Sequence, residues 1–216
     1  AIDGPAGAGK STVALRVASA LGLPLVDTGA IYRSLALLAK RKKIGTDDAA
    51  GLTDLARSLN VRFVLDGEVN RIHLHDEDVT DSIRKPDISM DASSVSRHPA
   101  VRSALLSHQR AYVESQGAVL EGRDIGTEVL PHASLKFFLD AKPEERARRR
   151  YEEMEALGLD CEYRQVLAEV IARDDQDRSR STAPLKPADD AVVLDSTEMS
   201  IDEVVGTIVD AARRLT

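Results

Sequence analysis

Nine residues near the start of the chain combine glycines, an ammonium group and hydroxyls in the pattern G-x-x-x-x-G-K-[ST]. Glycine tolerates backbone angles that turn N–H groups inward around an anion, and the N-terminus of a following helix adds partial positive charge. Lys10 is expected to reach the β- and γ-phosphates of a nucleoside triphosphate, and the Ser11 hydroxyl to ligate Mg²⁺. The pattern therefore predicts an ATP-binding P-loop made of Gly4, Pro5, Ala6, Gly7, Ala8, Gly9, Lys10, Ser11 and Thr12.

Arginines form a second group of residues suited to phosphate chemistry. Arg33 and Arg123 each follow a predicted strand, at the carboxyl edge where α/β sheets bind ligands. The planar guanidinium group binds phosphate through two hydrogen bonds. A second anionic substrate facing ATP needs such cations to hold two phosphate groups close together. The arginines therefore favour a phosphorylated second substrate.

A denser arginine cluster lies between residues 146 and 150. Arg146 and Arg150 are expected to contact the ATP phosphates on the side of a lid that begins at residue 151. The alternative is an exposed helix face, because glutamates precede two of these arginines by four residues, in the pairs Glu144–Arg148 and Glu145–Arg149. Both interpretations remain open at this level.

The elements that must position these residues alternate between strand and helix. Apolar runs predict strands at 1–3, 25–27, 118–121, 135–140 and 191–195. The last three are of the kind covered on both faces in parallel sheets. Helical periodicity predicts helices at 13–21, 30–43, 47–59, 100–115, 143–156, 162–175 and 201–214. Residues 61–65 and 71–75 flank an Asp66-Gly67 turn and predict a hairpin, and 79–100 are expected to be irregular. The order predicts an α/β core that carries a small second lobe.

Several blocks of the sequence resemble the bacterial cytidylate kinase family of P-loop nucleoside monophosphate kinases. Beyond the P-loop they are DTGAIYR at 27–33, EGRDIGT at 121–127, RDDQDRSR at 173–180 and ADDA at 188–191. The similarity extends over essentially the whole chain. It implies an α/β fold, with a five-stranded parallel sheet flanked by helices, a small α+β insert that binds the nucleoside monophosphate, and a helical lid.

The resemblance also implies a division of the chain and a set of residues for CMP. The P-loop core is expected at 1–59, 101–150 and 181–216, the insert at 60–100 and the lid at 151–180. Arg33, Arg123 and Arg180 match positions that bind the CMP phosphate, with Thr28 nearby. The base is assigned to Ser93, Arg102 and Asp124, and the sugar to Arg173 and Asp177. The implied catalytic residues are Lys10, Arg123, Asp124 and Arg180.

Selection of cytosine follows from its hydrogen-bonding groups. A carboxylate that accepts from N4 and an arginine that donates to N3 or O2 distinguish cytosine from uracil. The attacking phosphate is already mostly ionised at neutral pH, because the second pKa of a monoester is ~6, so a general base is not required. The expected reaction is transfer of the γ-phosphoryl group of ATP to CMP or dCMP, giving ADP and CDP or dCDP.

Composition restricts the alternatives. The 216 residues carry a formal charge of −7 and 3% aromatics, which argues against a nucleic-acid partner. A single Cys, an N-terminus without a basic segment and the lack of a long apolar run predict a cytoplasmic protein without a membrane partner. We also expect a monomer, since the sequence contains no pattern typical of a dimer interface.

Other P-loop functions fit less well. A guanine-specific [NT]-K-x-D motif is not found, and Ala141 follows the strand-ending Asp140 where helicase-like ATPases place Glu. Two alternatives remain open. One is a kinase for UMP, AMP or shikimate, and the other is a regulatory module that holds ATP without transferring phosphate.

Overall fold

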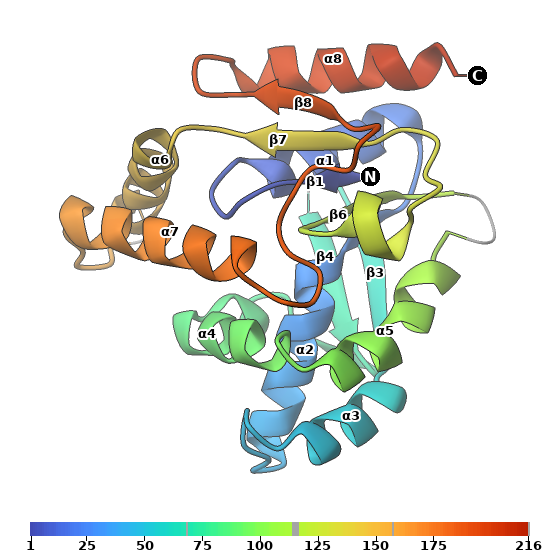
Figure 1. Cartoon of the computed structure of the whole chain (residues 1–216), viewed down its shortest axis with the longest axis vertical. Helices are drawn as coiled ribbons and strands as arrows, with labels where there is room; N and C mark the ends of the chain where they lie inside the picture. Colours follow the sequence, from blue (N-terminus) through green and yellow to red (C-terminus); the bar gives the residue numbers. More distant parts are fainter. Residues whose placement is uncertain (68, 114–116, 157, 216) are drawn as a thin grey trace. The chain divides into compact units, whose positions relative to one another are not determined.

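The computed structural model describes residues 1–67, 69–113, 117–156 and 158–215 (Figure 1). Two compact units are distinguished by their internal contacts. Ala1–Val17 and Gly122–Thr216 form the phosphate-loop unit, and Ala18–Glu121 form the hairpin unit. Over the described ranges, a five-stranded sheet has the order β2-β6-β1-β7-β8, and a three-stranded sheet has the order β3-β4-β5. The predicted α/β class with a five-stranded sheet is confirmed.

The phosphate-loop unit contains parallel strand pairs. β1 (Ile2–Asp3) pairs with β7 (Phe137–Asp140), which pairs with β8 (Val192–Asp195). The first turns of α1 (Lys10–Leu21) follow β1, and η2 (Ile125–Val129) is a short π-helical turn. α6 (Pro143–Ala156) and α7 (Tyr163–Arg178) pack side by side, and α8 (Ile201–Arg213) ends the unit.

The hairpin unit begins with the last turns of α1. β2 (Leu25–Asp27) pairs in parallel with β6 (Val119–Gly122), and the hairpin consists of β3 (Val61–Asp66) and β4 (Val69–Leu74), extended by β5 (Glu77–Asp78). α2 (Thr28–Arg41) packs against α3 (Ala49–Arg57) and α4 (Pro86–Val95), and α3 packs against α5 (Pro99–Ala111). The buried side chains of these helices form the apolar centre of the unit.

One predicted irregular segment is helical. Residues 79–100 contain the 3-10 turn η1 (Ser82–Arg84), all of α4 and the start of α5. Pro86 occupies the first turn of α4, where its missing N–H is not needed. Ile88, Ala92 and Val95 recur at helical spacing and are buried. The prediction was wrong because polar residues between these positions conceal the apolar face.

β8 is also not the doubly covered strand that was predicted. Val192 and Val193 are 46% and 57% exposed, and β8 lies at the end of the strand order. By contrast, Phe137, Phe138 and Leu139 of β7 are buried. Strand position explains the difference, because an outer strand of a sheet has a neighbour on one side only.

The remaining boundaries agree with the predictions to within a few residues. α2 starts at Thr28 because the Asp27 carboxylate accepts a hydrogen bond from the Ala30 N–H, 2.9 Å away, and caps the helix. The predicted end of the helix at 100–115 falls on residues 114–116, outside the described residues. Residues 68, 157 and 216, which belong to the predicted insert, lid and core, are also outside them. Among the described helices, none has the length and apolar character needed to cross a membrane.

Candidate functional site

The predicted P-loop runs between β1 and α1, as its sequence pattern requires. Gly4, Gly7 and Gly9 have φ of +149°, +75° and +83°, a region that residues with a Cβ rarely adopt. A Cβ on Gly4 would lie 2.0 Å from the Leu139 carbonyl oxygen, so neighbouring backbone also requires glycine there. The loop is therefore fixed by its glycines and by the strand beside it.

The polar residues of the loop differ in their exposure. Lys10 is buried, and its Nζ donates to the Pro5 carbonyl oxygen, 2.6 Å away, across the loop. Ser11 and Thr12, in the first turn of α1, are exposed. The first N–H groups of a helix point outward without intrahelical acceptors, which makes this turn suited to bind an anion.

Asp3 connects β1 to the segment that carries Arg123 and Asp124. Its carboxylate is buried and accepts hydrogen bonds from the Ile125 and Gly126 N–H groups, at 2.8 and 2.7 Å. Burial raises the pKa of Asp3 above its ordinary value, and the two N–H groups act in the opposite direction. Asp3 therefore fixes the backbone directly after Asp124.

Two predicted phosphate-binding arginines are brought together by one carboxylate. Arg123 Nε donates to Asp177 Oδ2 at 3.2 Å, and Arg180 donates to Asp177 Oδ1. Asp177 is 2% exposed, whereas the Arg123 and Arg180 side chains are 23% and 12% exposed. Two guanidinium groups therefore share one buried carboxylate. The arrangement is suited to bind an anion such as phosphate.

Asp124 and Arg173 are the other residues of this unit that are predicted to bind CMP, and they lie close in the sequence to that cluster. Asp124 is 7% exposed and directly precedes η2. π-Helical turns are rare and frequently occur at functional sites. Arg173 lies on α7, one turn before Asp177, and is partly exposed. Asp177, predicted to contact the sugar, has both carboxylate oxygens occupied by arginines, so its contact with a sugar hydroxyl stays a prediction.

The α6 arginines fall into two environments. Arg146 is 1% exposed and all three of its guanidinium nitrogens donate to protein oxygens. Arg148 is 52% exposed and pairs with Glu145 and Glu152, so the predicted Glu144–Arg148 pair is wrong. The predicted Glu145–Arg149 pair is confirmed, with Nε 2.8 Å from Oε1.

The ion pairs and the burial of the α6 arginines can be compared with the ATP contacts predicted for Arg146 and Arg150. Both arginine partners hold the pKa of Glu145 at about 2, well below its usual range. Arg150 lies 3.9 Å from Glu169 of α7. The buried position of Arg146 does not favour the direct ATP contact predicted for it, and the contact predicted for Arg150 stays a prediction.

The hairpin unit carries the other predicted CMP residues, and two of them, Thr28 and Arg33, lie in the first turns of α2. Thr28 is buried, and its hydroxyl donates to the Glu121 carbonyl oxygen, 2.8 Å away. Arg33 Nη2 lies 2.6 Å from Asp27 Oδ2. A Cβ on Gly29 would lie 3.0 Å from Arg33 Nη1 and 3.1 Å from Asp27 Oδ1. The block at 27–33 thus caps its own helix and orients its own arginine.

Arg102 lies on α5 and Ser93 lies on α4, two helices of the same unit. The Arg102 guanidinium carbon lies 5.6 Å from the centroid of the Tyr32 ring, a cation–π distance, and its Nη1 donates to the Ser96 carbonyl oxygen at 3.3 Å. Ser93 lies on α4, which packs against α2, and is partly exposed.

Sequence reasoning did not assign roles to four residues that hold the predicted ones in place. They are Asp3, Asp27, Tyr32 and Asp174. Asp27 and Tyr32 belong to the sequence block at 27–33, and Asp27 precedes a helix, which is the usual signal for an N-cap. Asp3 and Asp174 carry no local signal, because their partners lie more than twenty residues away along the chain.

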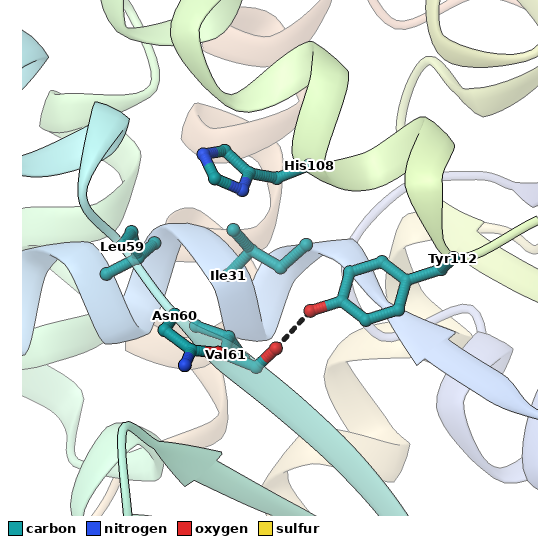
Figure 2. A pocket seen from close by; sticks show the side chains of 6 residues that line it. All are labelled: Ile31, Leu59, Asn60, Val61, His108 and Tyr112. Carbon is teal, nitrogen blue, oxygen red and sulfur yellow. Dashed lines mark hydrogen bonds between the residues drawn. The ribbon is translucent and has the colours of Figure 1, made fainter.

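A separate small cavity lies in the hairpin unit (Figure 2). It has a volume of about 50 Å³ and is lined by Ile31, Leu59, Asn60, Val61, His108 and Tyr112. The Tyr112 hydroxyl donates to the Val61 carbonyl oxygen at its edge. Ligand pockets usually measure roughly 300–1,000 Å³, so this cavity is too small for a nucleotide. In the part of the chain that the structure describes, no group of three or more His, Cys, Asp or Glu side chains could hold a metal ion.

Comparison with known proteins identifies the family of the chain. The sequence profile of the family described as Cytidylate kinase matches residues 1–214. A protein of Pseudomonas aeruginosa (strain LESB58) named Cytidylate kinase is 51% identical over 216 residues, covering 99% of this chain and 94% of that protein. One of the same name from Aeromonas hydrophila is 47% identical over 213 residues, covering 99% and 93%.

A solved structure is similar in fold alone. It is that of an uncharacterized protein from Eubacterium ventriosum, with a TM-score of 0.52 and 13% identity, covering 99% of this chain and 96% of that one. The sequence matches show the family as well as the fold, because they extend over nearly the full length of the chain, at 47% and 51% identity for the two named relatives. The chain therefore belongs to the cytidylate kinase family, a family of kinases.

Proposed function

We propose that this chain transfers the γ-phosphoryl group of ATP to CMP or dCMP, giving ADP and CDP or dCDP. The observation that carries the proposal is the convergence of Arg123 and Arg180 on the buried Asp177 carboxylate. These arginines lie in the same unit as the P-loop. A protein that only holds ATP needs no second phosphate site, whereas a nucleoside monophosphate kinase does.

The proposed mechanism is positioning and charge neutralisation. Lys10 and the first N–H groups of α1 bind the ATP phosphates, and Arg33, Arg123 and Arg180 bind the CMP phosphate. A CMP phosphate oxygen attacks the γ-phosphorus in line, and the bond to the β-γ bridging oxygen breaks. That oxygen leaves with ADP. A general base is not needed, since the CMP phosphate is already mostly ionised.

Mg²⁺ fits the donor chemistry of the loop. The Ser11 hydroxyl is an exposed, hard oxygen donor in the first turn of α1. Proteins usually bind Mg²⁺ through few side chains together with the substrate phosphates. When bound, Mg²⁺ supplies charge neutralisation at the phosphate oxygens. Ser11 is the residue that we propose holds it.

Base selection is proposed to depend on Asp124, Arg102 and Ser93. Asp124 accepts from the cytosine N4 amino group, and Arg102 donates to N3 or O2. Opposite uracil, the Asp124 carboxylate would face the O4 oxygen, acceptor against acceptor. The backbone after Asp124 is held by Asp3, which supports a fixed carboxylate at this position. Arg173 and Asp177 are proposed to contact the sugar.

The predicted division of the chain becomes part of the proposal. The P-loop core comprises 1–59, 101–150 and 181–216, residues 60–100 form the CMP-binding insert, and residues 151–180 form a lid that excludes water from ATP. In the described part of that lid, Tyr151 and Tyr163 pack edge to face with ring centroids 6.1 Å apart. The protein is proposed to act as a cytoplasmic monomer.

The test is a coupled assay of ADP release with ATP and Mg²⁺. The acceptors are CMP, dCMP, UMP, AMP, GMP and shikimate, and one reaction contains no acceptor. CMP or dCMP should give the highest rate. Equal rates with and without an acceptor would contradict the kinase proposal. A preference for UMP, AMP or shikimate would contradict the base assignment.

Two variants refine the assay. Lys10→Ala should abolish transfer while circular dichroism shows an intact fold, because the ammonium group is assigned to the phosphates. Asp124→Asn should reduce turnover of CMP more than that of UMP, because the amide can donate to O4. An equal loss for both acceptors would place Asp124 elsewhere.

A further inference from the structure

The most deeply buried arginine of the chain connects the P-loop to α7. Arg146, on α6, is 1% exposed, and its partner Asp174, on α7, is 3% exposed. Arg146 Nη1 donates to Asp174 Oδ1 at 3.0 Å, and Nη2 donates to Oδ2. This is a two-pronged ion pair removed from solvent, the arrangement for which arginine is better suited than lysine.

The same guanidinium also reaches the P-loop. Arg146 Nη1 donates to the Ala6 carbonyl oxygen at 3.0 Å, and Nε donates to the Ala141 carbonyl oxygen at 2.8 Å. Ala6 lies between two of the loop glycines, and Ala141 directly follows β7. One side chain thus links three segments of the phosphate-loop unit: the loop, the end of β7 and α7.

Close packing adds a second contact between α6 and the loop. Gly7 has φ of +75°, and a Cβ there would lie 3.2 Å from Arg146 Cβ and 3.3 Å from the Arg146 carbonyl oxygen. The loop backbone therefore lies directly against the helix at residue 146. Loop position and Arg146 position are fixed together.

We propose that Arg146 and Asp174 are positioning residues: the ion pair holds the Ala6 carbonyl and thereby the shape of the P-loop, and it couples that shape to α7. In the sequence, Asp174 lies between Arg173 and Asp177, two residues that we propose contact the sugar of CMP. The inference rests on the proposed role of the loop in binding ATP. It replaces a direct contact between Arg146 and ATP with an action through Ala6.

The test begins from the expected cost of breaking the pair. Removing one partner leaves an uncompensated buried charge, which can prevent folding, whereas replacing both with apolar residues is often neutral. The double variant Arg146→Met/Asp174→Leu is therefore the main probe. Arg146→Lys is the second variant, because its ammonium can pair with Asp174 but lacks the planar fork that reaches all three segments.

The primary readout is calorimetric binding of a non-hydrolysable ATP analogue with Mg²⁺, for variants whose thermal unfolding confirms that they are folded. Both variants should bind the analogue roughly tenfold to a hundredfold more weakly, the range of one hydrogen bond from a charged donor. KM for ATP should rise, and KM for CMP should rise with it. A merely structural role would lower the amount of folded enzyme and leave the dissociation constant and both KM values unchanged.

Arg148→Met is the matched control. It removes an arginine from the same helix whose pairs with Glu145 and Glu152 are exposed, and analogue binding should not change. Analogue binding within about twofold of the unsubstituted protein in both folded variants would overturn the inference. If the unsubstituted chain binds the analogue but phosphorylates none of the acceptors, the proposed function fails, while weakened binding in the variants still supports the positioning role.

Discussion

Several carboxylates that accept hydrogen bonds differ in burial between the two units of the molecule. In the phosphate-loop unit, Asp3, Asp174 and Asp177 are 4%, 3% and 2% exposed, and each accepts at least two hydrogen bonds. In the hairpin unit, Asp87 and Glu77 also pair with cations, but their side chains are 52% and 54% exposed. Arg146–Asp174 and Arg41–Glu77 are both two-pronged ion pairs, but the first is buried and the second is exposed.

Burial decides what these carboxylates do. A buried carboxylate is costly unless all its partners are in place, so it fixes the groups around it. An exposed pair is screened by water and contributes about 0–1 kcal/mol. Residues that hold the P-loop and the arginines should therefore be sensitive to substitution, whereas the exposed pairs Lys40–Asp87 and Arg41–Glu77 should tolerate it.

The largest effect is expected for Gly4→Ala. The new Cβ would lie 2.0 Å from the Leu139 carbonyl oxygen on a backbone with φ of +149°, so β1 and β7 must separate. We expect a loss of about 4 kcal/mol or more in the free energy of unfolding, measured by urea denaturation. Gly67→Ala in the hairpin unit is the control, since its φ is +59° but a Cβ there would meet no atom within 4 Å beyond its chain neighbours. A similar loss of unfolding free energy in both variants would contradict the proposed difference between the two units.

Asp177→Ala should follow in size. It leaves Arg123 and Arg180 without their shared carboxylate, and we expect a loss of about 3 kcal/mol in stability. The kcat/KM for CMP should fall at least about a hundredfold, because the anion site is lost. Asp87→Ala is the exposed counterpart, and it should change both quantities little. Near-normal stability and turnover of Asp177→Ala would remove the proposed centre of the phosphate site.

Asp3→Asn tests a buried carboxylate that binds backbone. One oxygen remains as an acceptor, while the new amide N–H₂ faces a buried N–H. We expect this to lower the free energy of unfolding by about 2 kcal/mol. Activity should fall too, since the backbone after Asp124 loses a support. Asp78→Asn is the matched variant in the hairpin unit, because Asp78 Oδ1 accepts from the Thr80 N–H at 2.9 Å in an exposed position. A larger loss for Asp78→Asn would reverse the comparison.

The smallest effect is expected at Arg41, whose guanidinium pairs with Glu77 through two hydrogen bonds of 2.6 and 2.7 Å. These bonds hold the pKa of Glu77 below its ordinary value of 4.5. Because the Glu77 pKa is lower in the folded state than in the unfolded state, the pair stabilises the protein at pH values above the unfolded-state pKa. This contribution is lost as the pH falls through the folded-state pKa. Arg41→Met should raise the Glu77 pKa toward 4.5 in an NMR titration, with little change in the unfolding midpoint at pH 7. An unchanged Glu77 pKa would contradict the pairing in solution.

Local sequence signals explain what could be predicted. Strands β2, β6 and β7 are short apolar runs, and α6 begins at a proline, so their positions were predicted to within about two residues. α4 was not predicted, because polar residues separate its three buried ones. The P-loop was predictable because its function needs glycines at fixed spacing, a lysine and a hydroxyl in one short segment.

The sequence alone determined which residue types are available for phosphate chemistry, where the P-loop lies and which family the chain resembles. Only the tertiary structure decided which of the arginines are buried and what they hold. Arg146 and Arg148 are two residues apart on one helix, yet the first is enclosed by the P-loop and α7 and the second faces solvent. The physical reason is that a buried charge needs partners from distant segments, and only the folded chain brings Ala6, Arg146 and Asp174 together.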